Sequence, residues 1–307
     1  MTIWSVGGLS LTDGPFMIGA GVCKTPEATE EWLQVAPVVS GSYTPPLRSG
    51  NSGRVFYPET LEEFLRLGGG GNGFGMPNIG TDAAAKKFAA RSRTRPLIAS
   101  IAGFSVDDYL TGIVDLAQYD GIDANEINWG CPNTQGEHSD IISFNPVIAR
   151  KILSTIAYNQ LTTKPLWLKF SPYSNPAELK RMAELVNDFK DELRLTVVTC
   201  NTFPNAYFGR GKIDPNQGRG GLSGRALKYI ALGQVHQFRE YLDSSIDVIG
   251  VGGITTGDDI MDFLDAGAAA VQMTSLPFWA GNPKVFLEHL MDERTSSRFL
   301  AYLEKNS

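Results

Sequence analysis

Short apolar runs alternate with longer segments of helical periodicity along most of the chain. The first three runs cover residues 16–19, 35–41 and 96–102, and glycine, proline or polar residues bound each of them. Short apolar runs with such boundaries are typical of buried strands. Five further runs of the same kind follow at residues 121–128, 165–170, 195–200, 247–251 and 270–273.

Amphipathic segments separate these runs and predict helices, and Ser105 and Asn175 are N-cap candidates for two of them. Eight strands that each lead into a helical or partly helical segment imply an α/β fold with a parallel sheet closed into a (β/α)8 TIM barrel. We therefore predict one barrel domain over residues 1–307, with a short N-terminal hairpin that turns at residues 12–15 and an excursion after the sixth strand. The predicted helices cover residues 27–34, 60–67, 105–119, 146–159, 176–185, 227–241 and 258–266.

An open, doubly wound sheet is the alternative fold. Such a sheet would carry a Gly-x-Gly-x-x-Gly fingerprint after its first strand. Gly19-Ala20-Gly21 stands at that place, but Val, Cys and Lys follow it and the third glycine is missing. The barrel is therefore the better interpretation.

Residues 68–78 contain a run of glycines and predict neither helix nor strand, because glycine loses the most backbone entropy in either. A flexible linker is one interpretation. Asparagine, phenylalanine, methionine and proline residues within the stretch favour an ordered loop instead, because linkers are more uniformly Gly and Ser.

Polar or glycine-rich residues lie at the end of every predicted strand or directly after it. The carboxyl ends of the strands meet at one rim of a barrel, which is where barrel enzymes build their active sites. This concentration favours an enzyme. The residues concerned are Ala20 and Gly21, Ser42, Ser100, Asn128 to Asn133, Lys169, Asn201 and Thr202, Gly252 and Gly253, and Thr274 and Ser275.

Lys169 ends an otherwise apolar strand. A lysine is rarely buried without a partner, so an anionic group such as a bound cofactor is the better interpretation than a side chain that reaches out to water. The turn at Gly252 and Gly253, together with Thr274 and Ser275, offers backbone N–H groups where barrel enzymes usually hold phosphate.

Cys131 lies in a loop between Asn128 and Asn133, and the carboxamides of these two residues suit recognition of a small polar ring. A thiol there could act as general base or nucleophile. His138 is a rival base. Cys23 and Cys200 lie within or next to apolar strands, where we expect them to pack, and without any Cys-x-x-Cys pair no metal site is predicted.

The composition sets limits on the class of protein. Of 307 residues, 42% are hydrophobic and 20% charged, as in soluble globular proteins. The net charge of -6, without a basic cluster, argues against nucleic acid and anionic membrane surfaces as partners. No signal peptide or membrane-spanning run is visible, so the reducing cytoplasm is the expected compartment.

Four motifs together resemble the dihydroorotate dehydrogenase family of FMN-dependent barrels, in its soluble, cysteine-dependent class. They cover residues 72–78, 128–133, 220–227 and 249–254, and the resemblance extends from Gly19 to Pro283. It implies that the FMN phosphate lies at Gly224, Gly252, Gly253, Thr274 and Ser275. Lys169 would face the N1/O2 edge of the flavin, and the other expected cofactor contacts are Ala20, Gly21, Ser42, Ser100, Asn128 and Cys200.

The resemblance also implies the substrate contacts and the reaction. Cys131 would remove a proton from a carbon next to a ring carbonyl while hydride passes from the neighbouring carbon to FMN, which converts dihydroorotate into orotate in pyrimidine biosynthesis. A homodimer is implied, and fumarate, a quinone, or NAD through a separate electron-transfer subunit remain open as acceptors. The implied substrate-binding residues are Asn72, Asn128, Asn133, Asn201 and Thr202, with backbone amides of Gly75 and Met76.

One position departs from the family pattern. The family usually has a lysine just after the second strand, where this chain has Gly41. Either Lys24 or Arg48 supplies the cation instead, or the substrate is another dihydropyrimidine or cyclic amide without a carboxylate. Weaker alternatives are a tRNA-dihydrouridine synthase, which the string Asn-Trp-Gly-Cys-Pro at residues 128–132 also resembles, and a barrel that binds flavin without catalysis.

Overall fold

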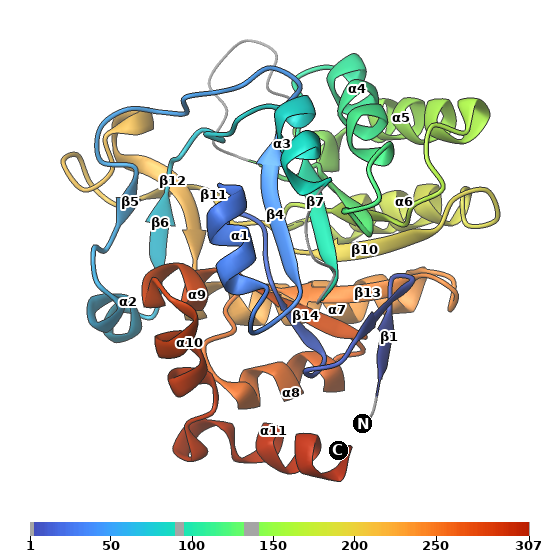
Figure 1. Ribbon diagram of the computed structural model, residues 1–307. Helices are drawn as coiled ribbons and strands as arrows, with labels where there is room; N and C mark the ends of the chain where they lie inside the picture. Colours follow the sequence, from blue (N-terminus) through green and yellow to red (C-terminus); the bar gives the residue numbers. More distant parts are fainter. Residues whose placement is uncertain (1–2, 90–94, 132–140, 307) are drawn as a thin grey trace.

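The computed structural model describes residues 3–89, 95–131 and 141–306 (Figure 1). Eight parallel strands close a barrel. Each strand pairs with the barrel strands that come before and after it in the sequence, and the last pairs with the first. The predicted (β/α)8 barrel is confirmed. Its strands are β3 (Phe16–Ile18), β4 (Val38–Tyr43), β7 (Leu97–Ile101), β8 (Ala124–Asn128), β9 (Leu166–Lys169), β10 (Leu195–Thr199), β13 (Asp247–Val251) and β14 (Ala270–Met273).

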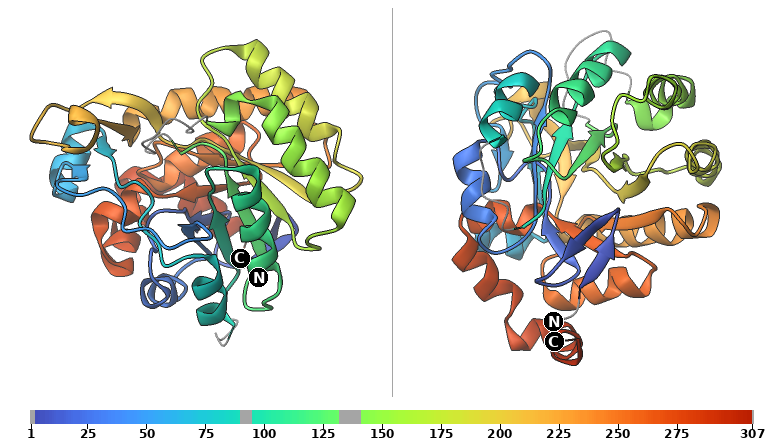
Figure 2. Two further views of the ribbon diagram at one scale, coloured as in Figure 1. Left: turned by 90° about the horizontal axis from the view of Figure 1, so that it is seen from above. Right: turned by 45° about the vertical axis from the view of Figure 1, so that its right-hand side comes forward.

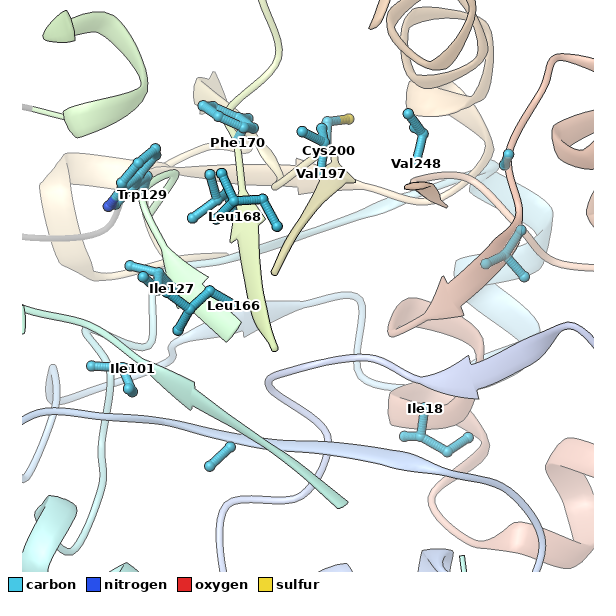
Figure 3. Packing of buried hydrophobic residues seen from close by; sticks show 14 of the residues in the cluster. Ile18, Ile101, Ile127, Trp129, Leu166, Leu168, Phe170, Val197, Cys200 and Val248 are labelled. Carbon is cyan, nitrogen blue, oxygen red and sulfur yellow. The ribbon is translucent and has the colours of Figure 1, made fainter. Parts of the chain in front are cut away.

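The two faces of the barrel wall bury different sets of apolar side chains. Met17 and Trp167 belong to a cluster inside the barrel. Ile127, Leu168 and Val197 point outward into the larger cluster that includes the surrounding helices (Figure 3). Because parallel strands are covered on both faces, they read as continuous apolar runs, and this is why the sequence pattern locates them.

Helices cover the outside of the barrel. The predicted N-caps are confirmed, since the Ser105 side chain accepts a hydrogen bond from the N–H of Asp108 at 3.1 Å and that of Asn175 from Ala177 at 3.0 Å. The sequence pattern does not predict α3 or the last three helices. The helices are α1 (Pro26–Trp32), α2 (Leu61–Leu67), α3 (Thr81–Phe88), α4 (Val106–Ala117), α5 (Pro146–Asn159), α6 (Pro176–Asn187), α7 (Lys228–Tyr241), α8 (Gly257–Asp265), α9 (Ser275–Ala280), α10 (Pro283–Leu290) and α11 (Glu293–Lys305), with 3-10 turns η1 (Ile142–Phe144), η2 (Pro215–Gly218) and η3 (Arg225–Leu227).

Among the described helices, none is both long enough and apolar enough to cross a membrane.

The N-terminal hairpin exists, but its predicted turn at residues 12–15 is wrong. Strands β1 (Trp4–Val6) and β2 (Leu9–Leu11) pair with each other and turn at Gly7 and Gly8. These glycines have φ of 56° and 78°, which a two-residue hairpin turn requires and other residues seldom adopt. The sequence pattern places the turn too late because residues 12–15, which follow β2, are also typical of turns.

The hairpin lies against the amino-terminal end of the barrel (Figure 2). Val6 and Leu11 are fully buried and join the interior cluster. The Trp167 indole N–H donates to the carbonyl of Gly7 at 3.1 Å. One end of the barrel is therefore closed by apolar packing, which leaves the other end for the polar residues.

Three residues of the glycine-rich stretch form a strand, contrary to the prediction of neither helix nor strand, whereas residues 73–76 belong to no helix or strand. β6 (Gly70–Asn72) pairs with β12 (Arg219–Ser223) and β5 (Phe56–Tyr57), and β11 (Phe203–Tyr207) completes a four-stranded sheet beside the barrel (Figure 1). A Cβ atom at Gly71 would lie 2.2 Å from the Phe208 ring, so glycine is required for close packing. The predicted excursion after the sixth barrel strand is confirmed, and it supplies β11 and β12.

The C-terminal helix packs on α8 and against the barrel through Phe299, which is fully buried and contacts the Phe16 ring edge-to-face at 6.1 Å. We expect Phe299→Ala to lower the free energy of unfolding by about 3–5 kcal/mol, because it leaves a cavity. Urea denaturation measures this change.

Tyr229→Ala is the matched control, because this aromatic side chain is 84% exposed. Its unfolding free energy should stay within about 0.5 kcal/mol of that of the unchanged protein. Equal stability of the two variants would contradict the packing described for α11.

Candidate active site

A cavity of about 1160 Å³, measured together with the solvent at its mouth, opens at the carboxyl end of the barrel. It brings together most of the residues that the sequence predicts for the site. Its walls combine backbone turns, carboxamides, one thiol-bearing loop and several apolar side chains. The predicted residues that line it are Ala20, Gly21, Ser42, Asn72, Gly75, Met76, Asn128, Cys131, Lys169, Cys200, Asn201, Thr202, Gly252, Gly253, Thr274 and Ser275.

Three predicted residues are not part of the described cavity wall. Ser100 is fully buried behind Ser42, and the two hydroxyl oxygens lie 2.8 Å apart. Gly224 lies next in the chain to Ser223, which does line the cavity. Asn133 lies outside the described residues, as does the rival base His138.

Lys169 has an anionic partner within the protein. Its ammonium lies 3.5 Å from a carboxylate oxygen of Glu126 and donates to the Gln272 side-chain carbonyl at 3.3 Å. The Gln272 amide in turn donates to the other Glu126 oxygen at 2.7 Å. Lys169 is 4% exposed and Glu126 is fully buried, so the pair occupies the barrel interior just below the cavity. Neither Glu126 nor Gln272 is predicted from the sequence as a site residue, although a charged residue in an apolar strand is a detectable signal.

A chain of hydrogen bonds continues from this pair to the carboxamides. Ser100 donates to Glu126 at 3.2 Å, and its hydroxyl meets that of Ser42. The side-chain amide of Asn128 donates to the Ser42 hydroxyl at 2.9 Å, and the side-chain amide of Asn201 donates to the side-chain carbonyl of Asn128 at 3.0 Å. Each carboxamide is therefore held in one orientation before any ligand binds, which lowers the entropic cost of binding.

The three thiols have different surroundings. Burial raises the pKa of Cys23 to about 12, assisted by the charge of Glu31. Burial also raises the pKa of Cys200 to about 12, against the opposing effect of Lys169. Both thiols are therefore protonated at neutral pH. Cys131 is half-buried and lines the cavity, so it is the thiol placed for chemistry on a bound ligand.

The turn after β13 forms a cradle of backbone N–H groups. Gly252 and Gly253 have φ of 120° and 79°, and a Cβ at Gly253 would lie 2.6 Å from the backbone nitrogen of Lys228. The Asp259 carboxylate fixes the following residues by accepting from the N–H of Thr255 at 2.8 Å. Burial alone would raise the pKa of Asp259, but its hydrogen bonds, first of all that from Lys228, hold it below the usual value. The donor set of this turn fits a phosphate group.

The backbone conformation at Gly41 and the residues around it leave no room for a side chain. Its φ is 97°, and a Cβ atom would lie 2.7 Å from the Tyr43 ring. Of the two cations suggested to replace a lysine there, Lys24 lines the cavity, whereas Arg48 lies over the Phe104 ring at 4.5 Å and is not part of the cavity wall.

Comparisons with known proteins agree with this geometry. The family model for dihydroorotate dehydrogenase matches residues 4–293. The chain is 30% identical over 299 residues to dihydroorotate dehydrogenase A (fumarate) of Lactococcus lactis subsp. lactis, covering 91% of each chain. The chain belongs to the dihydroorotate dehydrogenase family. It is also 31% identical over 281 residues to the catalytic subunit of dihydroorotate dehydrogenase B (NAD(+)) of Listeria monocytogenes, covering 89% of this chain and 86% of the relative.

The crystal structure of DHODH from Eimeria tenella in complex with ferulenol has the same fold, with a TM-score of 0.75 and 18% identity over 99% of this chain and 84% of the other. The resemblance inferred from the four motifs is therefore confirmed at the level of the family and of the barrel. Membership of this family makes the protein a flavin-dependent dehydrogenase of pyrimidine biosynthesis.

The buried ion pair generates a prediction for this dehydrogenase. We expect Lys169→Met to lower the free energy of unfolding of the flavin-free protein by about 3–5 kcal/mol, because it leaves the Glu126 carboxylate buried without its cation. Urea denaturation at neutral pH is the measurement.

The double variant Lys169→Met/Glu126→Gln is the control, since it removes both charges. It should be clearly more stable than Lys169→Met alone. A double variant at or below the stability of the single variant would contradict the pairing.

Proposed function

We propose that the protein oxidises dihydroorotate to orotate with FMN as cofactor and Cys131 as general base. The observation that carries the proposal is that one cavity joins Cys131, the fixed carboxamides of Asn128 and Asn201, and Lys169. Two similar relatives bear names of dihydroorotate dehydrogenases, one of the fumarate type and one of the NAD(+) type.

The cavity wall fits FMN in its donor groups. The cradle at Gly252 and Gly253 would hold the phosphate, with Thr274 and Ser275 on the adjacent strand end and Gly224 behind Ser223. Lys169, at the end of β9, would support the N1/O2 edge of the ring system. When bound, FMN supplies an acceptor for the hydride that leaves the substrate.

The remaining chemistry belongs to side chains of this protein. The carboxamides of Asn72, Asn128 and Asn201 offer donors and acceptors that match the alternating N–H and C=O groups of a dihydropyrimidine ring. The Cys131 thiolate would take the proton from the carbon next to a ring carbonyl. The electron pair left on that carbon forms the new C=C bond as hydride leaves the neighbouring carbon. The substrate thus loses two hydrogens and is oxidised by two electrons.

A second candidate keeps the flavin and the base but changes the substrate to a dihydropyrimidine or cyclic amide without a carboxylate. The absence of a side chain at Gly41 motivates it.

Anaerobic reduction of the flavin by a panel of substrates separates these candidates. We expect the purified protein to be yellow and dihydroorotate to bleach its flavin absorbance faster than dihydrouracil. Fast bleaching by dihydrouracil alone would favour the second candidate. Colourless protein that takes up no FMN would contradict both.

The role of Cys131 predicts a specific loss of rate. Cys131→Ser should slow flavin reduction at pH 7 by about 100-fold or more, because a serine hydroxyl is a far weaker base than the thiolate of a cysteine. Stopped-flow absorbance under anaerobic conditions measures this rate. Cys23→Ser is the matched control and should leave the rate nearly unchanged, and equal effects of the two substitutions would refute the assignment.

A further inference from the structure

The backbone between the end of β8 and Cys131 is held by hydroxyl groups from other elements of the fold. Tyr109 of α4 donates to the backbone carbonyl of Asn128 at 2.9 Å. The Ser143 hydroxyl of η1 donates to the backbone carbonyl of Trp129 at 3.0 Å, and the Ser143 backbone N–H donates to the same oxygen at 3.2 Å. Two successive carbonyl groups before the thiol-bearing residue are therefore fixed from outside their own segment.

The third carbonyl group of this segment is held in the same way. The Ser171 hydroxyl donates to the carbonyl of Gly130 at 3.2 Å, and the backbone N–H of Ser171 donates to the Ser143 hydroxyl at 2.9 Å. A Cβ atom at Gly130 would lie 2.7 Å from that nitrogen, so the two backbones are in close contact. Three hydroxyls thus hold the three carbonyl groups that lead to Cys131.

Water does not compete for these hydrogen bonds, because the three hydroxyls are buried. Tyr109 is 4% exposed, and Ser143 and Ser171 are fully buried. Burial, joined by the charge of Cys131, raises the pKa of Tyr109 above its ordinary value, against a hydrogen bond from the backbone of Gly103. The Tyr109 hydroxyl therefore keeps its proton at neutral pH and remains a donor. A buried carbonyl group that lost its donor would be costly, so each bond restricts the backbone strongly.

A further layer of hydrogen bonds fixes the two serines. The side-chain amide of Gln234, on α7, donates to the carbonyl of Ser171 at 3.0 Å, and its side-chain carbonyl accepts from the N–H of Tyr173 at 2.9 Å. The Tyr173 hydroxyl donates to the carbonyl of Ser143. Both serines are therefore tied to α7 as well as to the segment before Cys131, and they form a fixed support for that segment.

We propose that Tyr109, Ser143 and Ser171 are positioning residues for Cys131 and that they set the rate of the proton transfer that it performs. A catalytic group that is misplaced by about 1 Å can lose about 100-fold in rate. None of the three belongs to the described cavity wall, so they act through the backbone and not on the ligand. The inference rests on the proposed function, to which it adds three residues outside the cavity.

Tyr109→Phe is the sharpest single test, because it removes the hydroxyl and keeps the buried ring. Anaerobic stopped-flow absorbance should show a rate constant for flavin reduction by dihydroorotate that is about fivefold or more lower at pH 7. The dissociation constants of FMN and of orotate, measured from the flavin spectrum, should change by less than about twofold. A purely structural role would instead lower the amplitude of bleaching, which counts competent molecules, and leave the rate constant unchanged.

A double-mutant cycle shows whether the hydroxyl acts through the thiol. In a Cys131→Ala background there is no thiolate to position, so adding Tyr109→Phe should change the residual rate constant by less than about twofold. The same proportional loss with and without Cys131 would overturn the inference. Ser143→Ala and Ser171→Ala should behave as Tyr109→Phe does in both backgrounds.

Two variants that remove hydroxyls elsewhere serve as matched controls. Tyr302→Phe removes a hydroxyl that accepts from the Trp4 indole N–H at 2.9 Å, beside the N-terminal hairpin. Thr29→Val removes a fully buried hydroxyl of α1. Both should leave the rate constant for flavin reduction within about twofold of that of the unchanged protein.

Other outcomes would also overturn the inference. One is an unchanged rate constant in Tyr109→Phe, Ser143→Ala and Ser171→Ala. Another is a slower reaction with an equal weakening of orotate binding, which would assign the hydroxyls to the support of the carboxamides that hold the ring.

Failure of the proposed function is separately visible. It would appear as an undiminished rate constant in Cys131→Ala, which would leave no base to position. A large loss in Cys131→Ala, together with unchanged rate constants in the three hydroxyl variants, would overturn the inference alone.

Discussion

An ion pair buried inside the barrel, between Lys169 and Glu126, is the constraint on which the cavity depends. Both residues come from neighbouring strands, β8 and β9, whose parallel register sets Asn128 beside Lys169. Removing two charges from water is costly unless further hydrogen bonds satisfy them, and here Gln272 and Ser100 supply these bonds. The same hydrogen bonds orient Lys169, Gln272 and Ser100 at the base of the cavity. One network therefore both stabilises these buried polar groups and fixes their positions.

The opposite end of the barrel supports this arrangement because it is closed. Val6 and Leu11 of the hairpin close it with apolar contacts and exclude water from below. Lys169 and Gln272 line the cavity at the other end of the barrel. A barrel that is apolar at one end and polar at the other places its chemistry at the carboxyl ends of the strands, as the strand direction requires.

The sequence predicts the barrel well because buried parallel strands produce apolar runs that need no knowledge of their neighbours. It also predicts most of the cavity wall, because the residues after parallel strands must meet at one rim. Glu126 and Gln272 were missed because their role depends on contacts between strands far apart in the chain. Strand β6 was missed because its glycines reflect the closeness of the Phe208 ring, which only the fold reveals.

Family membership fixes the class of chemistry, and the distribution of charge in the cavity adds a second constraint. Because Lys169 is paired with Glu126, the two together present a dipole to the cavity floor, whose field falls off faster with distance than that of an isolated cation. Lys24 has no such partner among the described residues, so its field extends further into the cavity. Lys169, with its charge offset, is suited to orienting a group that lies directly on it.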